Sequence, residues 1–289
     1  MKALILGRQG QLARALQDSV PSTVELCVLG QSDLDISDKA AVRDSCAGLR
    51  PEVIINAAAF TNVDGAEKDP ARAFAVNAQG ARNLALAAQA TNARFLHVST
   101  DYVFAGDSSD PYQVSDPTGP LNVYGQSKLE GEHAVTELLP ARSIILRTSW
   151  VYSPHGHNFL KTMLRVMGEK RRVRVVNDQR GTPTAAHSIA ETLWDFAQRP
   201  QLHGIFHWTD AGAASWYEFA VAIAEESRAL GLLPEGVAVE PITSAEYPVA
   251  ARRPRFSLLD SRATVEALGR TPMPWRERLR QVLKVLQNA

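Results

Sequence analysis

The N-terminal residues 1–13 contain the pattern that most restricts the fold of this chain. An apolar strand is expected over residues 1–6, and glycines at positions 7 and 10 turn it into a helix over residues 12–20. Gly7 permits a tight turn, Gly10 lets the backbone approach a pyrophosphate, and Ala13 lets the helix pack closely on the strand. The helix N-terminus then points at the anion. The pattern predicts a dinucleotide-binding turn, with an incidental turn as the alternative.

Strands and helices alternate regularly through the first half of the chain. Apolar runs over residues 25–29, 52–55, 94–98 and 143–147 have the length of buried strands, and residues 69–92 have the spacing of a long amphipathic helix. Such alternation predicts an α/β fold with a doubly wound parallel (Rossmann) sheet. Ligands of such sheets bind beyond the carboxyl ends of the strands.

The alternation weakens after residue 152. We expect residues 1–152 to form a dinucleotide-binding domain and residues 153–289 to form mainly a smaller, C-terminal substrate-binding portion. Because no low-complexity linker separates them, the two portions are expected to interleave, with later strands and helices joining the first domain. Residues 106–120 are rich in Gly, Ser, Asp and Pro, and this long loop is expected to cover the site.

The balance of charge argues against a large polyanionic partner. The 289 residues contain 31 Lys and Arg against 31 Asp and Glu, so nothing attracts the chain generally to nucleic acid or to an anionic membrane surface. No apolar run is long enough for a membrane span or a signal-peptide core, which predicts a cytoplasmic protein with a small-molecule ligand. Cys27 and Cys46 are expected to be buried thiols. His155 and His157 lack further metal ligands nearby, so we expect no metal.

A four-residue interval later in the chain brings two complementary side chains together. Tyr124 and Lys128 fall on one face of a predicted helix. A free phenol has a pKa of about 10, and a nearby ammonium favours the phenolate, so we expect Lys128 to lower the pKa of Tyr124 and make it an effective proton donor. Thr100, which follows the 94–98 strand, is expected to hydrogen-bond a substrate carbonyl oxygen. Taken alone, a Tyr and a Lys at this spacing also arise by chance.

The sequence around these residues resembles a known superfamily. Ser-Thr-Asp-Tyr-Val-Phe at 99–104, Pro-Leu-Asn-Val-Tyr-Gly at 120–125 and Asn-Asp-Gln at 177–179 follow the order of the extended short-chain dehydrogenases/reductases, and within them the chain looks like the dTDP-4-dehydrorhamnose reductase family. The resemblance covers nearly the whole chain. It implies NAD(P)H-dependent reduction of the C4 ketone of dTDP-4-dehydro-β-L-rhamnose. Ala13 replaces the third glycine of the turn, a change that such turns tolerate.

The resemblance also implies roles for individual residues. The catalytic residues would be Tyr124, Lys128 and Thr100. The implied cofactor-binding residues are Gly7, Gly10, Gln11, Leu12, Asp35, Ile36, Ala59, Phe60, Thr61, Tyr124 and Lys128. The implied substrate-binding residues are Thr100, Asp101, Tyr124, Trp150, Asn158 and Arg253. For Trp150 the alternative is core packing, and for Arg253 the alternative to binding a nucleotide diphosphate is a solvated charge.

The residues after the 25–29 strand bear on the choice of cofactor. NAD-specific folds of this kind carry an acidic residue at the end of that strand to bind the adenosine ribose, whereas Gly30, Gln31 and Ser32 follow here. Without that carboxylate, a 2′-phosphate meets no repulsion, and Arg8 in the glycine turn offers a cation to neutralise it. We expect NADPH to be accepted, with NADH as the alternative cofactor. The alternative for Arg8 is a solvated surface charge.

Two other functions remain open from the sequence. A nucleotide-sugar 4,6-dehydratase or epimerase of the same superfamily recycles bound NAD, but the dehydratase pattern has Asp-Glu after the Thr, whereas here Asp101 is followed by Tyr102. A non-catalytic, reductase-like regulatory subunit could keep Tyr124 and Lys128, because fold does not settle function. The sequence leaves the oligomeric state open, and a homodimer is compatible with it.

Overall fold

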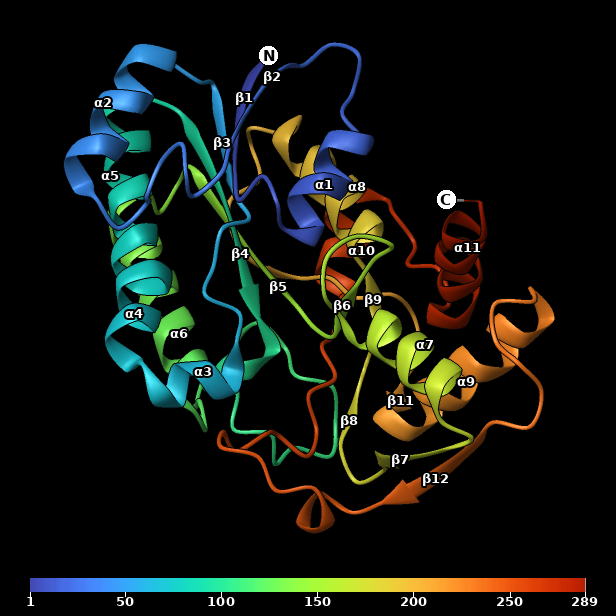
Figure 1. Ribbon diagram of the computed structural model, residues 1–289. Helices are drawn as coiled ribbons and strands as arrows, with labels where there is room; N and C mark the ends of the chain where they lie inside the picture. The colour runs from blue at the N-terminus through green and yellow to red at the C-terminus, as the bar shows by residue number, and fades with distance from the viewer. Residues whose placement is uncertain (289) are drawn as a thin grey trace.

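A six-stranded parallel sheet forms the centre of the molecule (Figure 1). The computed structural model describes residues 1–288. Within them the strands of this sheet lie in the order β10-β5-β4-β3-β1-β2. Their bounds are β1 Lys2–Leu6, β2 Glu25–Leu29, β3 Val53–Asn56, β4 Arg94–Thr100, β5 Ser143–Thr148 and β10 Gly204–His207. Most of them are short, buried apolar runs, as is typical of a parallel sheet covered on both faces.

Helices cover both faces of this sheet. One face carries α1 Gln11–Asp18 and α8 Ala186–Ala197, and the other carries α2 Lys39–Leu49, α5 Gly80–Thr91 and α6 Val123–Leu138 (Figure 1). Successive strand residues point to opposite faces. Ile5 on β1 therefore packs into the core under α1 and α8, while its neighbour Leu4 packs into the core under the other three helices. Each strand thus contributes to two apolar cores.

The sheet has its switch point between β1 and β3. The chain pairs β1 with β2 on one side and then crosses to place β3 on the other side, which opens a crevice at the carboxyl ends where dinucleotides bind in folds of this type. Gly7 follows β1 with a φ of +99°. A side-chain carbon at Gly7 would lie 3.0 Å from the backbone of Ala57 and Ala58 after β3. The predicted doubly wound sheet and its tight glycine turn are confirmed.

Residues after β5 build a smaller part beside the sheet. Its main helices are α7 Phe159–Glu169, α9 Trp216–Ala229 and α11 Trp275–Gln287. Its short strands pair as β6 Val151–Tyr152 with β9 Thr184–Ala185, β8 Arg180–Gly181 with β11 Ala214–Ser215, and β7 Arg172–Val176 with β12 Ala238–Ile242. Tyr152, Phe219 and Leu279 belong to its separate apolar core. Because α8 and β10 come from this stretch yet join the large sheet, the chain passes between the two parts more than once.

Short helices complete the fold. They are α3 Val63–Lys68, α4 Pro70–Phe74 and α10 Arg262–Leu268. Across residues 1–288, no helix combines the length and the apolar character needed to cross a membrane.

The single helix expected over residues 69–92 is interrupted in the structure. Between α4 and α5 lies a π-helical segment, Ala75–Gln79, which is a form often found at functional sites. Its buried Asn77 bonds the N–H and the carbonyl of Phe60 and the hydroxyl of Ser127 on α6. The expectation of one regular helix was wrong, because these bonds join segments far apart in the sequence and leave no trace in local spacing.

A buried ion pair ties α6 to β5. Arg147 on β5 donates to both carboxylate oxygens of Glu132 on α6, with Nη2···Oε2 at 2.7 Å and Nε···Oε1 at 3.0 Å. Both side chains are almost fully buried, and the guanidinium lies 5.0 Å from the ring centroid of Phe104. Each charge compensates the other away from water, so the loss of one partner would leave an unpaired buried charge.

Glu132→Gln should therefore lower the free energy of unfolding by about 3–5 kcal/mol, measured by urea denaturation. The matched control is Glu169→Gln, which breaks an exposed pair with Arg165 on α7 and should cost at most about 0.5 kcal/mol. Equal effects of the two substitutions would contradict the stabilising role of the buried pair.

Candidate active site

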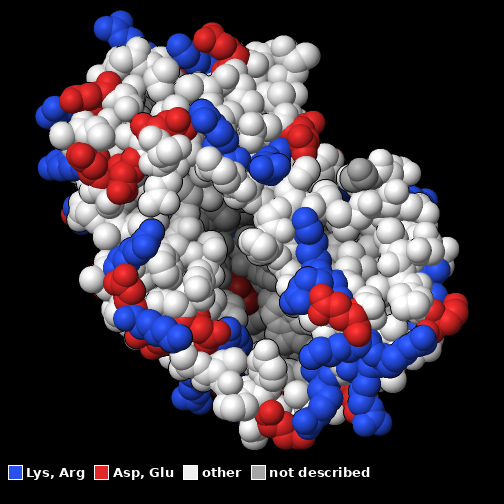
Figure 2. Space-filling model, in the orientation of Figure 1, with Lys and Arg blue, Asp and Glu red and all other residues white. Residues whose placement is uncertain are grey.

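A cavity of about 770 Å³ lies beyond the carboxyl ends of β1, β3 and β4. Figure 2 shows the surface hollowed where the large sheet meets the smaller part. The walls come from the glycine turn, the residues after β3 and β4, helix α6 and the segment from β5 to α7. Such a volume is typical of sites that enclose a small ligand. The cavity therefore lies where a doubly wound sheet binds its ligands.

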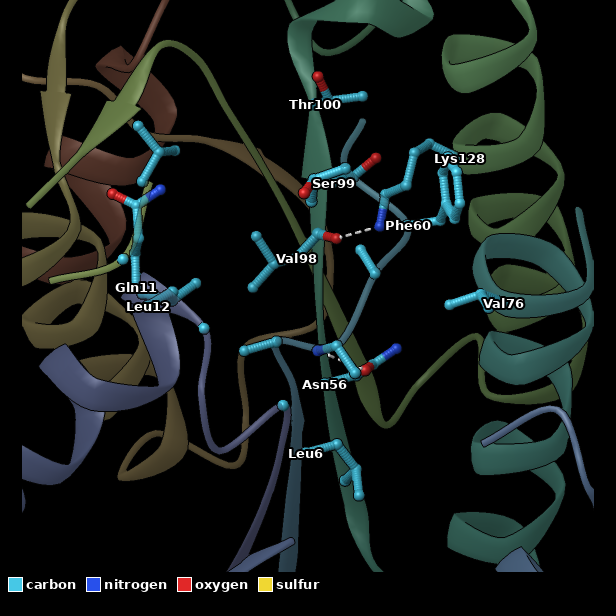
Figure 3. Close-up of a pocket in the computed structure, with 18 of the residues that line it drawn as sticks. Leu6, Gln11, Leu12, Asn56, Phe60, Val76, Val98, Ser99, Thr100 and Lys128 are labelled. Carbon is cyan, nitrogen blue, oxygen red and sulfur yellow. Dashed lines mark hydrogen bonds between the residues drawn. The ribbon is translucent and has the colours of Figure 1, made fainter. Parts of the chain in front are cut away.

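The glycine turn forms one side of the cavity at the N-terminus of α1. Gly10 precedes α1 and has no side chain to cap the first N–H groups of the helix, so these donors favour an anion such as a pyrophosphate. Gln11 and Leu12 also line the cavity, across from Lys128 (Figure 3). The amide oxygen of Gln11 accepts a hydrogen bond from Asn158 Nδ2 at 2.8 Å. This bond connects the glycine turn to the smaller part.

The segment after β3 supplies the neighbouring wall. Ala59, Phe60 and Thr61 all line the cavity. Asn77 fixes the backbone of Phe60 through hydrogen bonds of 2.8 and 3.1 Å. The structure thus places the three predicted residues of this segment between the glycine turn and α6.

The end of β4 and the start of α6 bring three more predicted residues together. Thr100 Oγ1 donates to Asp101 Oδ1 at 3.0 Å, and Tyr124 meets the ring of Tyr102 edge to face at 5.6 Å. This approach depends on Gly125, because a side-chain carbon there would lie 2.2 Å from the carbonyl oxygen of Tyr102. Thr100, Asp101 and Tyr124 therefore share one cavity.

The expectation that Lys128 lowers the pKa of Tyr124 was wrong. Burial raises the pKa of Tyr124 to about 12 and the Asp101 carboxyl adds to the rise, while a hydrogen bond with Thr100 opposes it. Lys128 directs its amine to a different group, since Nζ donates to the carbonyl oxygen of Val98 at 2.6 Å (Figure 3). A phenol with this pKa keeps its proton at neutral pH, so Tyr124 is present in the protonated form that a donor needs, but as a weaker acid than a free tyrosine.

Burial also changes the pKa of Lys128. Its side chain is 2 % exposed, and removal from water lowers its pKa to about 8, although the carboxylate of Glu132 one turn along α6 opposes this change. At neutral pH most molecules still carry the ammonium form. One of its three N–H groups is bound to Val98, which leaves the others for a hydroxyl in the cavity.

Asp101 is a buried carboxyl with spare hydrogen-bonding capacity. Burial raises its pKa to about 7, and a hydrogen bond from Thr100 opposes the rise. Among residues 1–288, its Oδ2 atom finds no hydrogen-bond partner. Because Asp101 lines the cavity, this oxygen is able to bind a ligand hydroxyl.

Asp35 and Ile36 line the far end of the cavity, beyond the glycine turn. The carboxylate of Asp35 accepts hydrogen bonds from the hydroxyl and the N–H of Ser37 at 2.7 and 2.9 Å, and these bonds lower its pKa. The cap of α2 is Asp38, which accepts from the N–H of Ala40 at 2.9 Å. The predicted ligand contacts and the helix cap in this segment therefore use different residues.

Arg8 lies beside the end of β2 and outside the cavity lining. Its guanidinium pairs with Asp33 at 2.9 Å and donates to the carbonyl of Val28 at 3.2 Å. Asp33 in turn accepts from the N–H of Gly30 at 2.7 Å. Asp33 thus brings a carboxylate to the end of β2, where the sequence suggested none, and a 2′-phosphate would have to displace it from Arg8.

Two stacked indoles border the cavity on the side of the smaller part. Trp150 follows β5 and its ring lies 3.6 Å from that of Trp216 at the start of α9, with 5° between the ring planes. Both residues line the cavity. Trp150 has a φ of +48°, which is unusual for a bulky residue and is held by its surroundings. The tryptophan predicted from the resemblance is thus stacked on a second one at the edge of the cavity.

Of the two remaining predicted substrate-binding residues, Asn158 and Arg253, only the first lines the cavity. Asn158 lines the cavity, and it also caps α7 by accepting from the N–H of Lys161 at 3.0 Å. Arg253 does not line the cavity. Its guanidinium binds the carboxylate of Asp64 at 2.8 and 3.2 Å, so a diphosphate would have to displace Asp64 to reach it.

The loop over residues 106–120 does not cover the cavity, contrary to expectation, and none of its residues lines it. Tyr112 in this loop stacks on Phe104 at 4.3 Å. The N–H of Tyr112 donates to the carbonyl of Leu258 at 2.8 Å. These contacts hold the loop against a C-terminal segment.

Sequence reasoning missed three residues that shape this site. Asn77 and Trp216 act through contacts with distant segments and carry no local signal. His97, which lies behind Lys128 with Nε2 3.5 Å from Nζ, does carry one: a polar residue inside a buried apolar strand requires a partner.

A parallel sheet with a glycine turn at its switch point, and a tyrosine and a lysine one helical turn apart in the same crevice, define a short-chain dehydrogenase/reductase. A family model described as the RmlD substrate binding domain matches residues 1–288. The chain is 42% identical over 288 residues to the dTDP-4-dehydrorhamnose reductase of Aggregatibacter actinomycetemcomitans, with 97% of this chain and 98% of that protein covered. The chain belongs to the dTDP-4-dehydrorhamnose reductase family.

Solved structures agree with this assignment. The dTDP-4-dehydrorhamnose reductase of Clostridium acetobutylicum matches with a TM-score of 0.93 at 38% identity, covering 99% of this chain and 100% of that one. The Bacillus anthracis reductase, determined in complex with NADP, also matches with a TM-score of 0.93, at 35% identity over 98% of this chain and 99% of that one.

Asp101→Asn should stabilise the protein at pH values above about 7 and have little effect near pH 4. The folded pKa of Asp101, about 7, lies above its ordinary value, so the wild type loses stability as the pH rises from about 4 to 7, whereas asparagine stays neutral. The gain should reach about 4 kcal/mol, measured by urea unfolding across this range. A difference that does not change with pH would show that Asp101 titrates normally.

Proposed function

We propose that this chain reduces the C4 ketone of dTDP-4-dehydro-β-L-rhamnose with NADPH and forms dTDP-β-L-rhamnose, the last step of dTDP-L-rhamnose synthesis. The observation that carries the proposal is the meeting of Thr100, Tyr124 and Lys128 in one cavity that begins at the glycine turn. The names of the related reductases support the substrate.

The residues of the cavity fit a dinucleotide. The cavity runs from Asp35 past the glycine turn to Lys128. Because Gly7 has no side chain, the backbone after β1 packs closely against the backbone after β3. The uncapped N-terminus of α1 offers N–H groups to the pyrophosphate. When bound, the reduced nicotinamide supplies a hydride to the C4 carbon of the sugar.

Each catalytic side chain then has a separate task. Tyr124 keeps its proton at neutral pH and gives it to the C4 oxygen as negative charge develops there. Thr100 turns its single hydroxyl hydrogen from Asp101 Oδ1 to the same oxygen. Lys128 uses the N–H groups not bound to Val98 to hold the nicotinamide ribose next to Tyr124. Asp101 and the Trp150 indole border the space for the sugar.

The residue after Asp101 argues against a dehydratase. Elimination of water needs a second acid-base group beside the ketone. Tyr102 occupies that position, and burial holds its pKa well above the ordinary value for a tyrosine, with the Asp101 carboxyl adding to the rise. It therefore does not ionise in the range where such a base works.

Tyr124→Phe should lower kcat for reduction of the ketosugar by about 10²–10⁴-fold, because the proton donor is lost while the ring remains. The assay follows loss of NADPH absorbance with the ketosugar generated in situ. Binding of NADPH, measured by fluorescence, serves as the control for folding. Full turnover by a folded Tyr124→Phe variant would refute the role of Tyr124. A wild-type protein that binds NADPH but reduces no nucleotide sugar would support a regulatory subunit instead.

Arg8→Ala should reduce kcat/KM for NADPH by about tenfold or more and leave that for NADH nearly unchanged, since a charge-assisted bond to the 2′-phosphate is lost. The matched control is Arg14→Ala, because Arg14 is exposed on α1 and does not line the cavity. Parallel losses with both cofactors would show that Arg8 supports the turn without reading the 2′-phosphate.

A further inference from the structure

A chain of buried polar side chains runs along the wall of the cavity from β3 through β4 to α6. Its members are Asn56, His97 and Lys128, which are 2 %, 1 % and 2 % exposed. Asn56 and His97 lie opposite each other in the pairing of β3 with β4. Asn56 Nδ2 is 3.1 Å from His97 Nδ1, and His97 Nε2 is 3.5 Å from Lys128 Nζ.

The backbone fixes the direction in which hydrogen bonds are donated along this chain. The N–H of Ala58 donates to Asn56 Oδ1 at 3.1 Å, and within an amide only the oxygen accepts such a bond. The amide nitrogen of Asn56 therefore faces His97 and donates to Nδ1. Since Nδ1 acts as an acceptor, a neutral imidazole must carry its proton on Nε2.

His97 is neutral at the pH of the reaction. Burial holds the pKa of His97 well below its usual range, and the nearby Lys128 lowers it further. The Nε2–H group of His97 thus faces Lys128 Nζ. An ammonium has no acceptor to offer it, whereas a neutral amine does.

We propose that His97 is a positioning residue which, held in its Nε2–H tautomer by Asn56, presents a hydrogen-bond donor to Lys128 and so favours the amine over the ammonium. The catalytic meaning of this arrangement rests on the function proposed above. A lysine that holds its third proton weakly releases it readily towards a phenol oxygen after Tyr124 has protonated the substrate.

Three other charged or titratable groups lie near Lys128, and none of them favours its amine form. Glu132 on α6 favours the ammonium, but its carboxylate is paired with Arg147 from β5. Asp101 from the end of β4 and Tyr124 on α6 line the same cavity as Lys128. The carboxylate or phenolate form of either would favour the ammonium as well. From β3, Asn56 reaches Lys128 only through His97.

The tautomer of His97 is measurable by NMR on protein carrying isotope-labelled histidine, without substrate or cofactor. In the wild type we expect the proton on Nε2. Asn56→Asp keeps an oxygen for the N–H of Ala58 but replaces the donor that faces His97 with an acceptor. The proton should then move to Nδ1, and Nε2 should accept from Lys128.

The effect on Lys128 is read by NMR titration of isotope-labelled lysine, with Lys128→Met to assign the signal. Asn56→Asp should raise the pKa of Lys128 by about 1–3 pH units. The added carboxylate also acts through its charge, so the same substitution is made in a His97→Phe background. There the charge remains but the imidazole is gone, and we expect a much smaller rise.

Kinetics give an independent readout if the proposed function holds. The alkaline fall in kcat should move to higher pH in Asn56→Asp and by much less when the same substitution is made in the His97→Phe background, a difference that a merely structural role of His97 would not produce. A wild-type proton on Nδ1, or equal rises in the pKa of Lys128 with and without His97, would overturn the proposal. Because both NMR measurements need no turnover, their failure is separable from failure of the proposed reductase activity.

Discussion

The close contact between the end of β4 and helix α6 is the constraint on which the site depends. Gly125 leaves room for the Tyr102 carbonyl, and this contact sets Tyr124 beside Thr100. Farther along α6, the buried Glu132 carboxylate holds Arg147 of β5. If α6 moved away from the sheet, Tyr124 and Lys128 would leave the crevice together, since both lie on that one helix.

Removal from water gives these side chains their chemical properties. Burial shifts Asp101, Tyr124, Lys128 and His97 towards their neutral forms, because a low-dielectric surrounding disfavours charge. For Tyr124 this means a phenol that retains its proton until the substrate oxygen becomes basic. For Lys128 it means an ammonium that gives up its proton more easily than a solvated lysine. Tyr124 and Lys128 thus both carry transferable protons close to the expected position of the reduced ketone.

The parts of the structure that follow from local rules were predictable from sequence. The glycine turn at Gly7 needs only its neighbours, and the shared helix face of Tyr124 and Lys128 follows from the helical period. The doubly wound sheet follows from the order of apolar runs. The hydrogen bonds and ion pairs between residues far apart in the sequence were not predictable in the same way. Arg253 pairs with Asp64 of a distant helix, and spacing cannot show this.

The pKa values of the buried side chains were a second property that the sequence could not predict. Lys128 was expected to act on Tyr124 through charge, whereas in the structure its amine bonds the Val98 carbonyl and desolvation dominates the pKa of the phenol. Burial depends on the whole fold, so the sign of such a shift is unknown until the packing is known. The same holds for His97, whose tautomer follows from the Ala58 N–H bond to Asn56.

Direct transfer of hydrogen from the cofactor to the sugar is the most direct measure of whether this crevice is a reductase site. NADPH labelled with deuterium on the transferred position of the nicotinamide would be supplied with the ketosugar, and the product examined by NMR. The geometry around Tyr124 and Thr100 predicts deuterium at C4 of the rhamnose unit. Product without deuterium, or with deuterium at another carbon, would contradict it.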